Sequence, residues 1–312
     1  MGEDLNNPLV SVIMPAYNAE KYISESIDSV IKQTFQNWDL IIVDDGSIDQ
    51  TSKIVNEFVK FDKRIKYYFQ ENGGQGKARN FGIINSGGRY IAFLDSDDLW
   101  LEDKLSNQID EIIKYDCDLV FSDSIVFENE SNSFRQMNTV EGYLNGKNAV
   151  NLFLKINRIP ILTVLVKKEK ILISGGFSEL KQIQCVEDYH LWIKLLIDQN
   201  LFWGSGIVTA KYRLHNNSAT SNDRLVTHKI PDMLYDLSNI YPKYGCLLKK
   251  SIFKIVINQY LNEYISFNEI GLFSKKYFTL FDRVIFLFPL KIFNNVFGAR
   301  FTNRLIKRYF ND

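Results

Sequence analysis

Short apolar runs alternate with stretches of helical periodicity through the first half of the chain. Residues 10–14, 40–43, 65–69, 90–94 and 118–122 are rich in β-branched, aliphatic and aromatic side chains, the composition of buried strands. Between them, residues 19–33, 51–61 and 101–115 repeat apolar side chains every three or four positions, as a helix with one buried face does. This alternation predicts an α/β fold in which helices flank a mostly parallel sheet.

The second half of the chain changes character twice. Residues 128–145 are polar and irregular, and we interpret them as an excursion over the surface. Residues 161–166 predict a strand, and residues 188–197 predict a helix. Beyond residue 217 the periodicity is helical throughout, so we expect an α/β domain over residues 1–217 and a helical C-terminal region over residues 218–312.

The most informative polar segment follows the apolar run 90–94. It consists of Asp95, Ser96, Asp97 and Asp98, and unpaired carboxylates are rarely buried in a core. Carboxylates two residues apart at a strand end can converge on a hard divalent cation through their oxygen atoms. A solvated acidic turn is the simpler alternative for this segment taken alone.

Two other predicted strands also end in polar residues. The run 40–43 leads into Asp44 and Asp45, and the run 10–14 leads into Pro15, Ala16 and Tyr17. The carboxyl ends of parallel strands share one edge of the sheet, where open α/β sheets bind their ligands. Three such strand ends in one chain therefore predict a crevice of the kind that binds nucleotides.

These segments together resemble the inverting family-2 glycosyltransferases of GT-A fold, of the bacterial polysaccharide type. The matching pieces occur in the family's order and spacing over roughly residues 9–216, and they are 12–18, 42–51, 72–82, 95–98, 187–192 and 212–215. The resemblance implies a Rossmann-like sheet and transfer of a sugar from a nucleotide diphosphate sugar, with UDP favoured as the nucleotide. It implies as acceptor a hydroxyl of a saccharide or of a polyprenyl-linked sugar, and it leaves the identity of both sugars open.

The resemblance also implies a donor site at the first two strand ends. Pro15, Ala16 and Tyr17 would form a floor under the base, with Tyr17 either stacked on the base or packed in the core. Asp45 would accept the N3–H of uracil, a charge-assisted contact that distinguishes uracil and thymine from cytosine. Asp44 would either assist Asp45 or cap the turn.

The remaining donor and metal contacts would come from three other motifs. Arg79 is expected to hold an aspartate or a phosphate at the donor site, and Ser96 is expected on the donor side. Asp97 would bind Mn²⁺ or Mg²⁺ directly, while Asp95 would bind the ribose hydroxyls or reach the metal through water. His215 matches a family position near the metal or the diphosphate.

The acidic pair Glu187 and Asp188 is the expected catalytic pair. By resemblance, Asp188 is the general base that takes the proton of the acceptor hydroxyl, so that a single displacement inverts the anomeric carbon. A simpler interpretation is that both acids stabilise the amino terminus of the following helix through its dipole. The two roles are compatible, because a base at a helix start is held rigidly.

Two other classes of function fit fewer of these residues. A sugar-phosphate nucleotidyltransferase needs a glycine-rich basic loop after the first strand, where this chain has Pro15, Ala16 and Tyr17. A non-catalytic nucleotide-binding or receiver-like module accounts for Asp44 and Asp45 but not for the other acidic motifs. A serine hydrolase lacks support because the sequence contains no nucleophile-elbow pattern.

Composition sets the expected environment. The 312 residues are 46% hydrophobic and 24% charged with a formal net charge of zero, which is typical of a globular protein and gives no reason to propose a nucleic acid partner. The acidic N-terminus resembles no secretory signal, no run of 18 uncharged apolar residues occurs, and the three cysteines are widely spaced. We therefore expect a cytoplasmic protein.

The C-terminal segment departs from that average. Residues 275–312 contain eight lysines and arginines but only two acidic residues, and an apolar stripe at helical spacing follows Pro289. A basic amphipathic helix of this type can lie in the interface of an anionic membrane, here the inner face of the cell membrane. Alternatively, the stripe packs on the catalytic domain or joins copies of the chain in a homo-oligomer.

Overall fold

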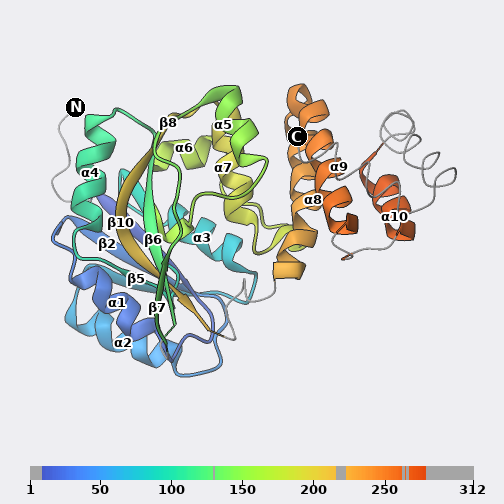
Figure 1. Ribbon diagram of the computed structural model, residues 1–312. Coiled ribbons are helices and arrows are strands. Elements are labelled where there is room, and N and C mark those ends of the chain that lie inside the picture. Colours follow the sequence, from blue (N-terminus) through green and yellow to red (C-terminus); the bar gives the residue numbers. More distant parts are fainter. Residues whose placement is uncertain (1–8, 129–130, 216–222, 262–263, 265–266, 279–312) are drawn as a thin grey trace, which may run out of the picture. The chain divides into compact units, whose positions relative to one another are not determined.

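A computed structural model describes residues 9–128, 131–215, 223–261, 264 and 267–278 (Figure 1). The chain forms two compact units, Met1–Ser221 and Asn222–Asp312. The first unit contains a ten-stranded sheet with the order β3-β2-β1-β4-β9-β6-β10-β5, to which β7 and β8 add at β6 and β10.

The first half of the sheet is parallel. β1 (Val10–Ala16) lies between β2 (Trp38–Asp44) and β4 (Tyr90–Phe93), and β3 (Ile65–Phe69) extends the sheet beyond β2. Every residue of β1 and β2 is buried, which explains why both strands are visible as apolar runs in the sequence. Ala16 pairs in register with Asp44, so the polar segments that follow β1 and β2 emerge side by side.

Helices cover both faces of this half (Figure 1). The apolar stripes of α1 (Ile23–Ile31), α2 (Thr51–Phe61) and α4 (Lys104–Lys114) join Val12 and Met14 of β1 in one core cluster. On the opposite face α3 (Gln75–Ile84) approaches β1 closely through Gly82, where a Cβ atom would lie 2.7 Å from a methyl carbon of Ile13. The α/β class predicted from the sequence is confirmed.

The second half of the sheet is mixed. β9 (Val164–Lys167) runs antiparallel to both β4 and β6 (Leu119–Glu128), whereas β10 (Phe202–Leu214) runs parallel to β6. β5 (Leu99–Trp100) is antiparallel to β10. The sheet is therefore parallel throughout β3-β2-β1-β4 and in the pair β6 and β10, and the remaining pairs are antiparallel. The apolar pattern of a buried strand carries no information about its direction.

Local predictions in this half need two corrections. The segment expected to be irregular contains β7 (Ser131–Gln136) and β8 (Gly142–Leu144), whose mostly polar residues give little hydrophobic signal. The strand expected over residues 161–166 begins as a 3-10 turn, Ile161–Thr163, after Pro160 and becomes extended at Val164. The helices α5 (Gly146–Phe153), α6 (Lys168–Ile173) and α7 (Glu187–Ile197) complete this unit as the structure describes it.

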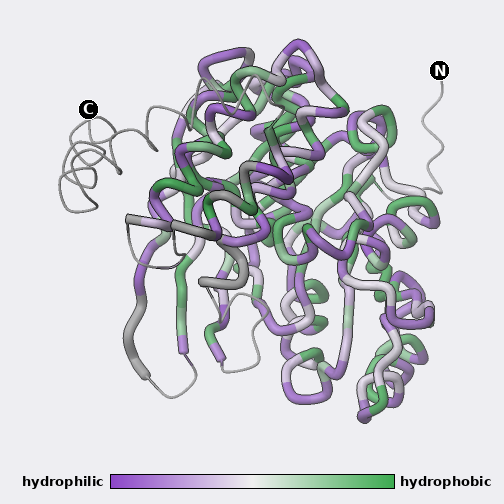
Figure 2. Tube along the Cα trace, turned by 90° about the vertical axis from the view of Figure 1, so that its right-hand side faces the viewer, coloured by the Kyte–Doolittle hydropathy of each residue, from purple (hydrophilic) through white to green (hydrophobic). Residues whose placement is uncertain are grey.

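The second unit is helical in its described residues. It comprises α8 (Asp223–Ile240), α9 (Gly245–Leu261) and α10 (Phe267–Tyr277). The Tyr277 hydroxyl and the Lys276 ammonium both bind the Asp232 carboxylate, at 2.7 Å and 2.6 Å, which fastens α10 to α8. Hydrophobic and hydrophilic positions alternate along the helices of both units (Figure 2).

Two predictions about membranes have different outcomes. The basic, apolar segment after residue 278 lies outside the described residues. Within the described ranges, every helix is too short or too polar to cross a bilayer.

Candidate active site

The loops after β1 and β2 are bound to each other at the carboxyl edge of the sheet. The backbone N–H of Asn18 donates to Ser47 Oγ at 2.9 Å, and the side-chain Oδ1 of Asn18 accepts the backbone N–H of Ile48 at 2.9 Å. Asn18 adopts a left-handed conformation (φ 47°), which asparagine tolerates better than most residues. These contacts hold Tyr17 at the edge with 54% of its surface exposed, so the core role considered for Tyr17 is excluded.

Asp44 and Asp45 are both engaged by their own chain, in different ways. Asp44 accepts the N–H of Ser47 and the hydroxyl of Tyr67, each at 2.8 Å, so it caps the turn, and burial together with Asp44 raises the pKa of Tyr67. Asp45 accepts hydrogen bonds from Gln70 Nε2 at 2.7 Å and from the backbone N–H groups of Gly73 and Gly74 at 2.8 Å. A carboxylate offers about four acceptor positions, so these three hydrogen bonds leave one position on Asp45, which is buried.

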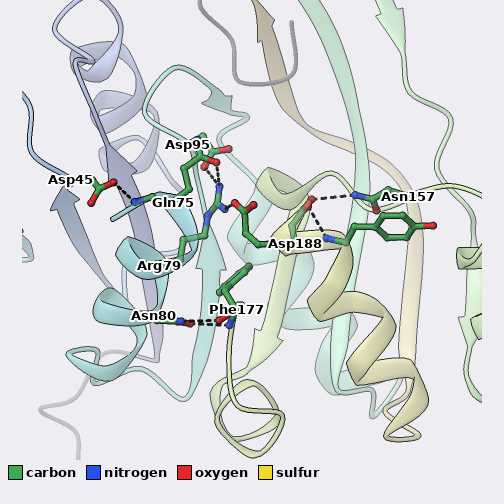
Figure 3. Close-up of polar contacts among 11 residues, drawn as sticks. Asp45, Gln75, Arg79, Asn80, Asp95, Asn157, Phe177 and Asp188 are labelled. Carbon is green, nitrogen blue, oxygen red and sulfur yellow. Dashed lines mark hydrogen bonds and ion pairs between the residues drawn. The ribbon is translucent and has the colours of Figure 1, made fainter. Parts of the chain in front are cut away.

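Arg79 connects the carboxylates of two distant motifs. Its guanidinium, 2% exposed, donates from Nη2 to Asp95 Oδ1 at 2.7 Å and from Nη1 to Glu187 Oε1 at 2.8 Å. Burial acts to lower the pKa of Arg79, but the charges of Asp95 and Glu187 outweigh it and raise the pKa. Figure 3 shows Arg79 pointing from α3 toward Asp95 and toward the start of the helix that carries Asp188.

Phe177 and Gln75 complete the surroundings of Arg79. The Arg79 guanidinium carbon lies 5.6 Å from the centre of the Phe177 ring, and Nη2 also reaches Gln75 Oε1 at 3.4 Å. The Asn80 side chain holds the backbone of Phe177: Oδ1 accepts the Phe177 N–H and Nδ2 donates to the Phe177 carbonyl, each at 2.9 Å (Figure 3). Two consecutive residues of α3, Arg79 and Asn80, thus fix the loop that precedes α7.

Glu187 and Asp188 occupy the first turn of α7 but face different partners. Glu187 is 3% exposed, and its ion pair with Arg79 directs it into the protein rather than toward a substrate. Asp188 is partly exposed; its Oδ1 accepts the Tyr189 N–H at 2.7 Å and its Oδ2 accepts Asn157 Nδ2 at 3.2 Å. Burial, with a smaller contribution from Glu187, raises the pKa of Asp188 to about 7.

The turn after β4 is attached to the end of β10. Asp98 is buried and accepts the backbone N–H of Arg213 at 2.8 Å, while Arg213 Nε donates to the carbonyl of Asp97 at 2.6 Å. Two residues beyond Arg213, His215 places Nε2 2.8 Å from Asp97 Oδ2. Ser96 lies partly exposed in the same turn.

Asp97 and His215 thus place one carboxylate oxygen and one imidazole nitrogen next to each other. Both are chemically suited to Mn²⁺, and a carboxylate also suits Mg²⁺. Among the described residues, no cluster of three acidic, histidine or cysteine side chains could hold a metal ion. A cation beside Asp97 would therefore need oxygen ligands from a substrate or from water, in the way that Mg²⁺ is commonly bound with substrate phosphates.

Two residues that contact Asp45 and Asp188, Gln70 and Asn157, were not identified from the sequence. Gln70 directly follows the strand Ile65–Phe69, so the rule that polar residues at strand ends line the crevice could have found it. Asn157 lies in a short polar segment without periodicity, and its sequence gives no comparable signal.

The chain is similar to known glycosyltransferases. Residues 11–169 match glycosyl transferase family 2. The chain is 36% identical over 216 residues to the putative teichuronic acid biosynthesis glycosyltransferase TuaG of Bacillus subtilis (strain 168), covering 69% of this chain and 82% of TuaG. It is 37% identical over 222 residues to the Escherichia coli UDP-Glc:alpha-D-GlcNAc-diphosphoundecaprenol beta-1,3-glucosyltransferase WfgD, covering 70% and 82% of the two chains.

Solved structures agree on the fold. S. aureus TarS 1-349 in complex with UDP-GlcNAc superposes with a TM-score of 0.69 at 19% identity, over 97% of this chain and 91% of that one. The mannosyltransferase PcManGT of Pyrobaculum calidifontis, in complex with GDP-Man and Mn²⁺, gives a TM-score of 0.58 at 15% identity, over 87% and 80%. The fold is that of a GT-A glycosyltransferase. The chain belongs to glycosyl transferase family 2.

We predict that Arg79→Ala lowers the free energy of unfolding by about 3–5 kcal/mol, because it leaves the buried Glu187 carboxylate without its cation. Chemical denaturation at neutral pH measures the loss. Lys77→Ala, an exposed position of the same helix, serves as the control and should change stability little. The double variant Arg79→Met with Glu187→Leu should recover most of the loss. Equal unfolding of Arg79→Ala and Lys77→Ala would show that the ion pair does not stabilise the fold.

Proposed function

We propose that this glycosyltransferase moves a sugar from a nucleotide diphosphate sugar to an acceptor hydroxyl with inversion, and that Asp188 is the general base. The observation that carries the proposal is the setting of Asp188. It stands partly exposed at the start of α7, its two oxygens are oriented by two hydrogen bonds, and its pKa is raised to about 7. A base whose pKa lies near the working pH combines ionisation with proton affinity.

The donor would bind at the carboxyl ends of β1 and β2. Tyr17 is exposed above the buried Pro15 and Ala16 and can stack on a base. The remaining acceptor position of Asp45 suits an imide N–H, which favours a uracil nucleotide. The UDP-sugar in the name of WfgD and the UDP-GlcNAc in the TarS complex support the same choice.

Asp97 and His215 would hold Mn²⁺ or Mg²⁺ together with the diphosphate of the donor. A bound cation would neutralise charge that develops on the leaving phosphate. Asp95 is already bound to Arg79, so in this proposal it positions the turn and reaches the ribose or a water molecule rather than the metal directly. Ser96 remains a candidate donor contact. The buried Glu187 and Arg79 would position Asp95 and α7 without touching either substrate.

The acceptor would be a saccharide hydroxyl on a lipid-linked precursor of a bacterial polysaccharide. The names of TuaG and WfgD, which refer to teichuronic acid biosynthesis and to a sugar on diphosphoundecaprenol, support this class. A membrane-bound acceptor is also compatible with a role for the basic residues between 275 and 312 at the inner face of the membrane.

We expect Asp97→Asn to abolish most of the transfer activity while leaving the fold unchanged, because the proposed cation loses its carboxylate ligand. The loss corresponds to several kcal/mol of transition-state stabilisation, on the order of 10³-fold or more in rate. Activity is measured by release of the nucleotide product at saturating Mn²⁺ or Mg²⁺, with thermal unfolding as the control for folding. Turnover close to that of the unmodified protein would contradict the metal assignment.

Asp188→Asn should retain donor binding and lose transfer by on the order of 10²–10⁴-fold, because an amide cannot accept the acceptor proton. In the unmodified protein, kcat/KM should rise with pH and level off above about 7, since the base works only in its ionised form. Calorimetric titration with the nucleotide measures donor binding by the variant separately from its loss of transfer. A parallel collapse of nucleotide affinity would place Asp188 in the donor site instead.

The basic C-terminal segment, residues 275–312, should bind anionic vesicles through its positive charge. We expect co-sedimentation of the full chain with phosphatidylglycerol vesicles at low salt and its loss at high salt. Replacing Arg304, Lys307 and Arg308 by glutamate should abolish the binding, since each basic residue contributes on the order of 1 kcal/mol. Neutral vesicles are the control. Equal sedimentation of both proteins would instead favour the tail as a packing or oligomer surface.

A further inference from the structure

Asn157 is a side chain outside the recognised motifs that touches the proposed base. It lies between α5 and the 3-10 turn Ile161–Thr163, and its Nδ2 donates to Asp188 Oδ2 at 3.2 Å (Figure 3). Its other end is also occupied, because Oδ1 accepts the backbone N–H of Ile159 at 3.2 Å. Since only the carbonyl oxygen of an amide can accept that N–H, the NH₂ group must face Asp188.

The segment that carries Asn157 is fixed on both sides. Before it, the hydroxyl of Tyr189 donates to the carbonyl of Phe153, and Tyr189 belongs to the same helix as Asp188. After it, Ile159 is buried and the indole N–H of Trp100 donates to the carbonyl of Leu162 at 2.8 Å. Asn157 is therefore attached to α7 and to the sheet, and its contact with Asp188 is part of a rigid frame.

We propose that Asn157 is a positioning residue for the general base: its amide orients Asp188 Oδ2 and stabilises the ionised carboxylate. This inference rests on the proposed function, because it assumes that Asp188 takes the acceptor proton. The Tyr189 N–H holds Oδ1 as a consequence of the helix start. Asn157 provides the side-chain hydrogen bond to Asp188. The remaining lone pairs of the Asp188 carboxylate can accept the incoming proton.

The charges around Asp188 define the effect of losing this contact. Burial and Glu187 on the same helix raise the pKa of Asp188, whereas Arg79 from α3, the Tyr189 N–H and the Asn157 amide lower it. A hydrogen bond to an ionised group typically shifts such an equilibrium by about one pH unit. A carboxyl whose pKa starts near 7 is about half ionised at pH 7, and after that shift only about one tenth of it would be ionised. The rate at pH 7 should therefore fall by about fivefold.

The test is the pH profile of kcat/KM for Asn157→Ala and for Asn157→Asp, measured with the same donor and acceptor as the unmodified protein. Asn157→Asp keeps the shape of the side chain but replaces the donating amide by a second carboxylate. It therefore still tests the contact if Asn157→Ala does not fold. We expect the acid limb to move up by about one pH unit in Asn157→Ala and further in Asn157→Asp. Above the shifted limb the rate of Asn157→Ala should recover to within about threefold of the unmodified protein, with unchanged affinity for the nucleotide.

Ile156→Ala is the matched control. This neighbouring side chain is 56% exposed, so its removal alters the same segment without removing the contact to Asp188. The acid limb of Ile156→Ala should coincide with that of the unmodified protein.

Two other results separate the failure of this inference from the failure of the proposed function. Suppose that Asp188→Asn is inactive, but that the acid limb of the kcat/KM profile does not move in either Asn157 variant, or that their rates fall equally at every pH. Asn157 then has a structural role only. If Asp188→Asn retains transfer, Asp188 is not the base, and the roles assigned to both residues are wrong.

Discussion

The buried ion pairs of Arg79 are the interaction on which the candidate site depends. A guanidinium at 2% exposure is tolerable only with carboxylate partners, and here it has one from the turn after β4 and one from the start of α7. These partners come from two motifs that are distant in the sequence, because Asp95 belongs to the turn beside Asp97 and Glu187 precedes Asp188. The planar, forked guanidinium suits this task, since its two Nη atoms can bind two carboxylates at a fixed separation.

The rest of the site is built from similar cross-connections rather than from isolated catalytic groups. Arg213 joins the end of β10 to the turn that contains Asp97, and thereby brings His215 to that carboxylate. Asn18 and Ser47 join the loops after β1 and β2 and leave Tyr17 exposed above them. Rigid attachment of this kind favours transfer reactions. Two substrates held in line have already lost translational and rotational entropy on binding, so less is lost in reaching the transition state.

Membership of glycosyl transferase family 2 limits the chemistry but not the substrates. TarS and PcManGT share the fold of this chain at identities of 19% and 15%, although one is bound to UDP-GlcNAc and the other to GDP-Man. Within this chain, the contacts that would select the nucleobase of the donor involve Asp45. The contacts that would select the acceptor lie near Asp188 and Asn157. In the proposed function, donor and acceptor selection would therefore be carried by separate elements of the fold.

The sequence by itself determined the features that depend on local pattern. The bounds of the helix at residues 51–61 and of the strand at residues 65–69 were predicted without error, because periodicity and burial act within one element. The polar residues at the ends of β1, β2 and β4 were found for the same reason. Tertiary structure alone decided the antiparallel direction of β9, the burial of Asp44 against Ser47 and Tyr67, and the exposure of Tyr17. It also decided that Arg79 pairs with Glu187, 108 residues away, and that Asn157 reaches Asp188, since contacts between distant segments leave no periodic signal in either segment.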